Sequence, residues 1–326
     1  MSHILVTGGT GFIGQSLIKV LQKEDVQIRA TYHGNKPVTE NGQDASVEWT
    51  RYDLEHDNDY SKLLADIDII IHLAGKAHIH KQNGHAGNSF VKINSEGTRQ
   101  LAEAAARAGV RRFLYLSTVK VHGDVTTKNS EGGYQRFTEN DRLNPQDPYA
   151  TSKLDAEHQL RKICQSSKMD YVILRPPLIY GPGVKANFLR LIDTVAKGIP
   201  LPFASIHNLR SLLYVENLGD AILACSRRPE ASNQVYLLSD IDISLTHLIH
   251  KIALFLGTKT LLFPCHGSLL KLAGVLTGKQ EIMTRLMESL VIDNSKLARE
   301  LGWKPPVSFD EGLGRTIDWY RKYHGK

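Results

Sequence analysis

The sequence predicts an α/β protein in which a doubly wound parallel sheet forms the main domain and a smaller mixed α/β lobe follows it. Three observations lead to this fold. Short β-branched runs alternate with helical patterns through the first half of the chain, which is typical of a parallel sheet covered by helices on both faces. A glycine-rich turn directly follows the first run. The alternation stops where prolines and glycines interrupt residues 176–183.

The helices, the long loop and the strands of the main domain follow from these patterns. Helices are predicted at residues 12–23 and 95–108, the second ending before Gly109. Residues 119–148 form a long polar stretch, and a loop of this size in a compact domain is usually functional. Strands are predicted at residues 4–7, 26–31, 47–52, 67–73, 113–117 and 171–174.

The second half of the chain is expected to contribute to both the main domain and the smaller lobe. Residues 176–183 are predicted to have no regular structure, because their prolines and glycines break helices and strands. The segment 214–238 is expected to return to the main sheet as one helix and one strand. We therefore assign residues 1–176 and 211–240 to the main domain, and residues 177–210 and 241–326 to a substrate-binding lobe.

The composition is that of an ordinary globular protein with a positive net charge. Lys plus Arg is 40 and Asp plus Glu is 34, which gives +6, and 41% of residues are hydrophobic. The excess favours an anionic ligand such as a nucleotide or a phosphosugar. No block of basic residues is interleaved with aromatic ones, so we expect no nucleic-acid partner.

Cysteine usage and hydropathy bear on the compartment. Cys164, Cys225 and Cys265 are odd in number and far apart, so they predict neither a disulfide framework nor a metal site, and they suit a reducing cytoplasm. No signal peptide is evident, and no stretch reaches the roughly 18 apolar residues of a transmembrane segment. Residues 268–277 fit an amphipathic helix over a cleft better than a helix on a membrane surface.

The glycine-rich turn, Thr7-Gly-Gly-Thr-Gly-Phe-Ile-Gly14, lies between a predicted strand and a predicted helix. Glycines there permit a tight turn and let backbone N–H groups approach a pyrophosphate at the helix N-terminus, so the turn predicts a dinucleotide site. Asp53, after the third strand, is placed to accept a hydrogen bond from an adenine amino group. Leu73, Ala74 and Gly75, after the fourth, offer a small surface beside the cofactor.

The end of the second predicted strand bears on cofactor choice. An acid about 20 residues past the glycines would bind a ribose 2′-OH and repel a 2′-phosphate. This chain has Tyr32 and His33 there, with Lys36 close behind and no acid. The sequence therefore favours NADP(H) over NAD(H), although nothing here forms an arginine clamp.

Tyr149 and Lys153 are four residues apart, so they share one face of a helix. A cation about 4 Å from a phenol is worth roughly 4 kcal/mol at an effective dielectric near 20, which lowers the phenol pKa by about three units at most. Tyr149 is then expected to act as a general acid or base on a sugar or alcohol oxygen. Ser117 and Thr118 end a predicted strand at the same sheet edge; one of them would hold the substrate oxygen, or both merely cap the strand.

Together these motifs resemble the extended short-chain dehydrogenases/reductases, in particular the 4-epimerases, 4,6-dehydratases and 4-keto-sugar reductases that modify nucleotide sugars. The resemblance runs in order along nearly the whole chain and implies a Rossmann fold for the main domain. Beside the glycine turn and the Tyr149–Lys153 pair, it rests on residues 72–75, 94–98, 116–118, 175–183, 210–215, 301–305 and 311–313.

The family's roles carry over by position. Tyr149 matches the acid/base, Lys153 the lysine that binds the nicotinamide ribose, and Thr118 the catalytic hydroxyl, with Ser117 before it. Asn187 and Arg210 match residues near the sugar phosphate and the nucleotide diphosphate. The implied cofactor-binding residues are Gly8, Gly11, Phe12, Ile13, Gly14, Tyr32, His33, Asp53, Leu54, Leu73, Ala74, Gly75, Asn94, Tyr149, Lys153 and Pro176.

The residues after the strand-end hydroxyl narrow the reaction class. Dehydratases of this family place an acid pair there, whereas Thr118 is followed by Val119 and Lys120. The missing acid at Tyr32 fits an exchanging NADP(H) enzyme, so we expect reduction of a UDP-4-keto-6-deoxy-(N-acetyl)hexose at C4, as in bacterial surface-polysaccharide (O-antigen) sugar synthesis. A UDP-sugar 4-epimerase with bound NAD is the alternative, and a non-catalytic NADP-binding regulator a more distant one. The resemblance also suggests a homodimer. His122 departs from the family, which has tyrosine there.

Overall fold

The computed structural model describes residues 2–37, 46–56, 59–77, 89–130, 132–278 and 280–324. Its main feature is a seven-stranded sheet in which every pairing is parallel. The order β3-β2-β1-β4-β5-β6-β9 reverses beside β1, and such a reversal opens a ligand crevice at the carboxyl ends of the strands. The strands are β1 (Ser2–Thr7), β2 (Val26–Tyr32), β3 (Val47–Arg51), β4 (Ile69–His72), β5 (Arg112–Leu116), β6 (Asp170–Arg175) and β9 (Gln234–Leu237).

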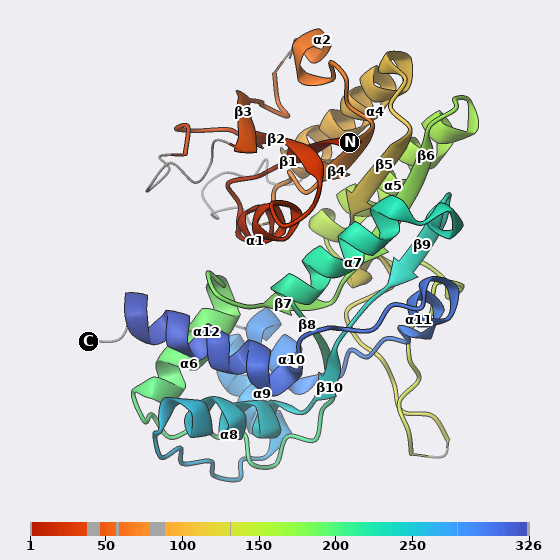
Figure 1. Ribbon diagram of the computed structural model, residues 1–326. Helices are drawn as coiled ribbons and strands as arrows, with labels where there is room; N and C mark the ends of the chain where they lie inside the picture. The colour runs from red at the N-terminus through yellow and green to blue at the C-terminus, as the bar shows by residue number, and fades with distance from the viewer. Residues whose placement is uncertain are drawn as a thin grey trace.

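Helices cover both faces of this sheet, as Figure 1 shows. On one face α1 (Phe12–Leu21) packs against α7 (Val215–Arg227), and their apolar sides share a core with β1, β4 and β6. On the other face α4 (Gly97–Ala108) packs against α5 (Pro148–Gln165). The strands are apolar along their length because both faces are buried. This arrangement confirms the predicted doubly wound α/β fold.

Most predicted elements of the main domain are present, with shifts at their ends. The helix predicted at 95–108 is preceded by a π-helical turn, Val91–Glu96, and ends at Gly109, which has the left-handed φ of 80° expected of a helix-terminating glycine. Short helical elements also occur at α2 (Tyr60–Leu63), Val119–Val121 and Pro229–Ala231. Segment 214–238 supplies α7 and β9, as predicted.

The smaller lobe is built on a second sheet with the order β10-β8-β7. Its strands are β7 (Leu178–Tyr180), β8 (Arg210–Tyr214) and β10 (Ile241–Ile243). The prediction that residues 176–183 lack regular structure was wrong for β7, which pairs in parallel with β8. Pro177 and Gly181 flank these three residues instead of interrupting them. β8 begins at the predicted lobe boundary and belongs to this second sheet; the division into two domains remains a prediction.

Helices pack around the second sheet, and one apolar core joins them to it. Lower in Figure 1 they form a separate layer beneath the main sheet. None of the helices in the described ranges is long and apolar enough to cross a membrane. The helices of this half are α6 (Ala186–Ala196), α8 (Leu245–Leu256), α9 (Gly267–Leu276), α10 (Gln280–Met287) and α12 (Phe309–Tyr323), with α11 (Ser295–Leu301) packed on β9.

Candidate active site

The glycine turn joins β1 to α1 and leaves no room for a side chain at Gly8 or Gly14. Gly8 has a positive φ of 73°, and a Cβ there would lie 2.9 Å from the backbone nitrogen of Ala74. A Cβ at Gly14 would lie 2.2 Å from the Gly8 carbonyl oxygen. Gly11, which precedes α1, supplies no capping side chain, so the first-turn N–H groups of α1 are left for an anion. The turn therefore fits the pyrophosphate of a dinucleotide.

Asn94 connects the segment after β4, which lies beside the glycine turn, to helix α5. Its Oδ1 accepts from Lys76 N–H at 2.8 Å, and its Nδ2 donates to the Lys76 carbonyl and to Ser152 Oγ, each at 3.0 Å. A Cβ at Gly75 would lie 3.0 Å from Asn94 Oδ1 and 3.5 Å from Lys153 Nζ. Gly75, Asn94 and Lys153 are thus brought together, and the Asn94 amide ties the segment after β4 to α5.

At the far end of the predicted cofactor site, Asp53 is held by its neighbours. Its carboxylate lies 3.3 Å from His33 Nε2 and 2.8 Å from His56 Nδ1, and it accepts from Glu55 N–H at 2.9 Å. Partial burial acts to raise the pKa of Asp53, but the Glu55 N–H bond and the His56 contact outweigh it, so the pKa lies below its ordinary value. Sequence reasoning did not anticipate the contact between His33 and Asp53.

Helix α5 presents the Tyr149–Lys153 pair. Asp147 caps it by accepting from Ala150 N–H at 2.7 Å, and Pro148 fits its first position. Tyr149 is half-buried with its ring edge-on to Phe90, the centroids 6.0 Å apart. These contacts fix the second residue of the helix at the carboxyl edge of the sheet, as predicted.

Lys153, one helical turn after Tyr149 in α5, is almost wholly buried. Its Nζ donates to the Leu116 carbonyl at 2.8 Å and lies 4.6 Å from the centroid of the Tyr115 ring. Burial lowers the pKa of Lys153 to about 8, although Glu157 opposes the shift. The charged ammonium form of Lys153 is therefore less stable at this position than in water.

The Tyr149 phenol does not have the depressed pKa that its spacing from Lys153 predicts. Burial, with a smaller contribution from the Asp147 carboxylate, raises the pKa of Tyr149 to about 12. Both effects disfavour the charged phenolate, so they act in the same direction. The expectation that the pKa of Tyr149 is lowered towards neutrality was wrong for this structure.

The two strand-end hydroxyls have different surroundings. Ser117 is buried and donates to Glu157 Oε1 at 2.6 Å. Glu157 is in turn paired with Arg175, whose Nε donates to Oε1 at 3.0 Å and whose Nη1 lies 2.9 Å from His122 Nε2. A catalytic role for Ser117 is therefore not supported, because its hydroxyl is committed to this buried network.

Thr118 begins the turn after β5. Its Oγ1 accepts from Lys120 N–H at 3.3 Å, and the Val119 N–H donates to the Pro176 carbonyl at 2.9 Å. The structure thus brings Pro176 beside Thr118, at the same sheet edge as Tyr149. Of the two predicted hydroxyls, Thr118 is the one free of the Glu157 network.

Arg210 and Asn187, the lobe residues predicted to bind substrate, differ in how deeply they are buried. Arg210, in β8, donates from Nη1 to the carbonyls of Arg285 at 2.8 Å and Glu288 at 3.1 Å, and burial lowers its pKa. Asn187 is exposed in the first turn of α6, 3.4 Å from Arg190. The structure therefore gives Arg210 a part in holding the end of α10, which the sequence did not show.

Arg285 reaches from the lobe to the catalytic helix and was missed by sequence reasoning. Its Nη2 lies 3.7 Å from Asp147 Oδ2, at the cap of α5, and Lys120 pairs with the same carboxylate. These cations keep the pKa of Asp147 below its ordinary value, against the opposing effect of burial. No local pattern marks Arg285, because the contact joins residues far apart in the chain.

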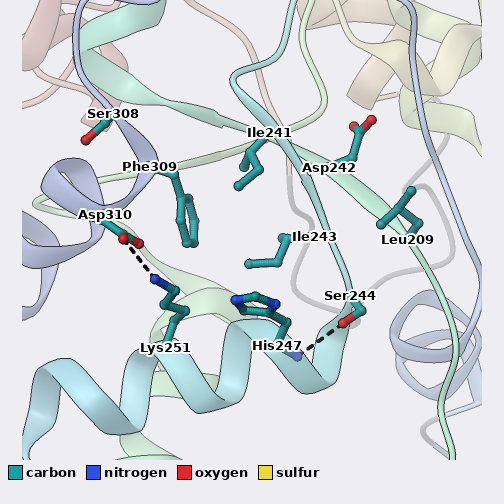
Figure 2. A pocket seen from close by; sticks show the side chains of 10 residues that line it. All are labelled: Leu209, Ile241, Asp242, Ile243, Ser244, His247, Lys251, Ser308, Phe309 and Asp310. Carbon is teal, nitrogen blue, oxygen red and sulfur yellow. Dashed lines mark hydrogen bonds and ion pairs between the residues drawn. The ribbon is translucent and has the colours of Figure 1, made fainter.

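A separate cavity of about 540 Å³ lies in the lobe, as Figure 2 shows. Lys251 and Asp310 form an ion pair of 2.8 Å at one side of it, and the helix caps Ser244 and Ser308 lie at its edges. None of the predicted site residues lines it. No group of His, Cys, Asp or Glu in the described part of the chain could hold a metal ion.

Comparison with known proteins identifies the family. The model of the NAD dependent epimerase/dehydratase family matches residues 4–239, more than half of the chain. A UDP-glucose 4-epimerase of Vibrio cholerae is 38% identical over 319 residues, covering 96% of this chain and 94% of the relative. The chain belongs to the NAD dependent epimerase/dehydratase family. This confirms the predicted resemblance and, with it, an enzyme family that acts on nucleotide sugars.

Two other similar proteins show lower sequence identity to this chain. A dTDP-glucose 4,6-dehydratase of Streptomyces griseus is 28% identical, over 99% of this chain and 95% of the relative. The solved UDP-glucuronic acid 4-epimerase of Bacillus cereus, in complex with NAD, superposes with a TM-score of 0.78 at 23% identity, over 99% of this chain and 100% of that one. The superposition confirms the Rossmann fold.

Proposed function

We propose that the protein reduces the C4 ketone of a UDP-4-keto-6-deoxy-(N-acetyl)hexose. The turn after β2 carries this proposal: its described residues include no acid, and a carboxylate in that turn would bind a ribose 2′-OH and suit a retained NAD. A reductase must instead exchange its spent cofactor after each turnover, which fits NADP(H).

The glycine turn would hold the pyrophosphate of a bound NADPH, and Asn94 and Lys153 would lie towards its nicotinamide end. The cofactor would supply the hydride for carbon 4. Tyr149 Oη donates its proton to the keto oxygen as the alcohol forms, and Thr118 Oγ1 holds that oxygen by a hydrogen bond. Arg210, with Asn187 nearer the surface, binds the diphosphate of the UDP-sugar.

NADPH is proposed over NADH because of the side chains after β2. Within the described part of that turn the charged or titratable side chains are His33 and Lys36. The Asp53 carboxylate lies 3.3 Å from His33 Nε2 and opposes a 2′-phosphate there, so the proposal requires the two basic side chains to outweigh it. One or two charge-assisted contacts to a 2′-phosphate would favour NADPH by about 1 to 2 kcal/mol, or roughly five- to thirty-fold in affinity.

A UDP-sugar 4-epimerase with retained NAD is the second candidate. It is favoured by the 38% identity to the UDP-glucose 4-epimerase of Vibrio cholerae. An epimerase restores its cofactor in each turnover, so it needs no added NADPH, whereas a reductase consumes one NADPH for each ketone.

The purified protein separates these candidates. Denaturing it and identifying any released nucleotide comes first, followed by assays with NADPH and a UDP-4-keto-6-deoxy-N-acetylhexose, and with UDP-glucose alone. Stoichiometric NADPH oxidation supports the reductase. Interconversion of UDP-glucose and UDP-galactose by protein that carries copurified NAD would refute the reductase and support the epimerase. NADPH binding with neither reduction nor epimerisation would indicate a regulator.

The substrate assignment has its own test at Arg210. Arg210→Ala should weaken UDP-sugar binding by about 2 kcal/mol, measured by calorimetry, while NADPH binding is unchanged. Arg210→Lys, which keeps a cation, is the matched control for lost charge. Equal UDP-sugar affinity in the wild type and Arg210→Ala would refute the assignment. The homodimer and the cytoplasmic location remain predictions, to be checked by mass in solution and by fractionation of cells.

A further inference from the structure

Lys120 contacts both segments that carry the groups of the proposed reaction, the turn after β5 and helix α5. Its backbone N–H donates to Thr118 Oγ1 at 3.3 Å. Its side-chain Nζ pairs with Asp147, which lies 27 residues later at the N-terminal cap of α5. One residue therefore joins the strand-end hydroxyl to the helix that carries Tyr149.

The first turn of α5 determines where the Tyr149 phenol lies, because Tyr149 is the second residue of the helix. Its ring packs edge-on against Phe90, with the centroids 6.0 Å apart. Within the described part of the chain, its hydroxyl makes no hydrogen bond that would fix it directly. The position of the phenol therefore depends on how firmly the start of the helix is held.

Asp147 holds this first turn and the Lys120 ammonium with different oxygens. Its Oδ1 accepts from Ala150 N–H at 2.7 Å, and its backbone carbonyl accepts from Thr151 N–H at 3.0 Å. Its Oδ2 is the oxygen that pairs with Lys120. A change at Lys120 is therefore passed through one rigid carboxylate to the turn that holds Tyr149.

The Lys120 ammonium is already committed to protein carboxylates. Besides Asp147 it lies 3.3 Å from Asp124 Oδ1, and its side chain is only 21% exposed. The Asp147 side chain is 26% exposed. Salt screens a partly buried pair of this kind less than it screens a pair on the open surface. Lys120 therefore suits a role in the framework of the site better than a direct contact with an anionic substrate.

We propose that Lys120 is a positioning residue for Tyr149. By holding Asp147, it keeps the first turn of α5 against the turn that carries Thr118, so that the phenol and the Thr118 hydroxyl reach the same substrate oxygen. The proposal rests on the proposed acid/base role of Tyr149, and it applies to the reductase and to the epimerase alike.

Turnover of the full-length enzyme tests the positioning role, with NADPH and a UDP-4-keto-6-deoxy-N-acetylhexose or, for an epimerase, with UDP-glucose. Lys120→Met should lower kcat about tenfold while KM for the nucleotide sugar changes less than about twofold, because geometry and not binding is disturbed. Lys120→Arg keeps the cation and should stay within about twofold of the wild-type kcat. Lys62→Met is the matched control, because Lys62 lies 3.9 Å from Asp59, which caps α2; this variant should behave as the wild type does.

A double-mutant cycle shows whether Lys120 acts through Asp147. Asp147→Asn removes the ion pair but keeps a side chain that caps a helix well, so its loss in kcat should resemble that of Lys120→Met. The double variant should lose no more than either single variant, because both changes break one interaction. Amide hydrogen exchange at residues 150–151 needs no substrate, and in Lys120→Met it should be about threefold faster or more.

Four outcomes would overturn the proposal: wild-type kcat in Lys120→Met, a rise in KM alone, no rescue by Lys120→Arg, or losses that multiply in the double variant. A rise in KM alone would make Lys120 a substrate-binding residue. If the wild type converts neither nucleotide sugar, or if Tyr149→Phe turns over as the wild type does, the proposed function is at fault instead. Hydrogen exchange then decides about Lys120 by itself, and an unchanged rate in Lys120→Met would overturn its role in holding α5.

Discussion

Replacing Lys153 by methionine should impair activity without lowering the free energy of unfolding at pH 7. The lysine is 5% exposed, and burial lowers its pKa from 10.5 to about 8. Methionine has a similar length and no charge to desolvate. We expect Lys153→Met to lose both turnover and cofactor affinity, because Lys153 is proposed to bind the nicotinamide ribose and to act with Tyr149, yet to be no less stable at pH 7 than the wild type.

The size of the effect follows from the pKa of Lys153. A shift from 10.5 to about 8 means that the buried ammonium costs about 3 kcal/mol below pH 8. Methionine removes that cost but also loses the bond to the Leu116 carbonyl, which is worth about 1 to 3 kcal/mol when the carbonyl is left without a partner. At pH 7 the variant should therefore be as stable as the wild type, or up to about 2 kcal/mol more stable.

The pH dependence gives the sharper test. Between pH 8 and 10.5 the folded wild type has released the Lys153 proton while the unfolded chain still binds it, so wild-type stability rises with pH in this window. The variant lacks this gain, and the difference in unfolding free energy should move by about 3 kcal/mol in favour of the wild type. Urea unfolding at pH 7 and at pH 10.5 measures it. An unchanged difference at the two pH values would refute the depressed pKa of Lys153.

Three further substitutions test the site. Tyr149→Phe should lower turnover about 10² to 10⁴-fold with UDP-sugar affinity unchanged, and steady-state turnover within threefold of the wild type would contradict it. Glu157→Gln should cost about 3 to 5 kcal/mol in chemical unfolding, because it leaves Arg175 buried without a counter-charge; a loss under about 1 kcal/mol would count against a buried pair. Gly14→Ala should abolish dinucleotide binding in calorimetry, because its Cβ would lie 2.2 Å from the Gly8 carbonyl oxygen; binding at wild-type affinity would show that the turn adapts.

The main fold could be predicted because its signals are local. Each parallel strand is a short apolar run, and Gly109 marks the end of a helix by adopting a φ of 80°, which disfavours other residues. The glycine turn is equally local, since Gly8 and Gly14 leave no space for a Cβ. Three-residue strands are less visible, and β7 was missed because its flanking prolines and glycine dominate the pattern.

The electrostatics of the site could not be predicted from spacing. Tyr149 and Lys153 share a helix face as expected, but the sequence does not tell how deeply each is buried. Burial opposes ionisation of the phenol and of the ammonium alike, so it raises one pKa and lowers the other. The contact between Arg285 and Asp147 was also out of reach, because it depends on how the lobe packs on the sheet.

The different surroundings of Ser117 and Thr118 follow from the buried ion pair beneath them. Glu157 lies four residues after Lys153 and eight after Tyr149, on the same side of α5, so its contacts orient the side of the helix that carries these two residues. By accepting from Ser117 and pairing with Arg175, it joins α5 to the ends of β5 and β6. Two fully buried charges are costly and add little net stability, so a positioning role explains them better than stability does. Ser117 anchors the strand end through these contacts, so the hydroxyl that we propose for substrate binding is the next one, that of Thr118.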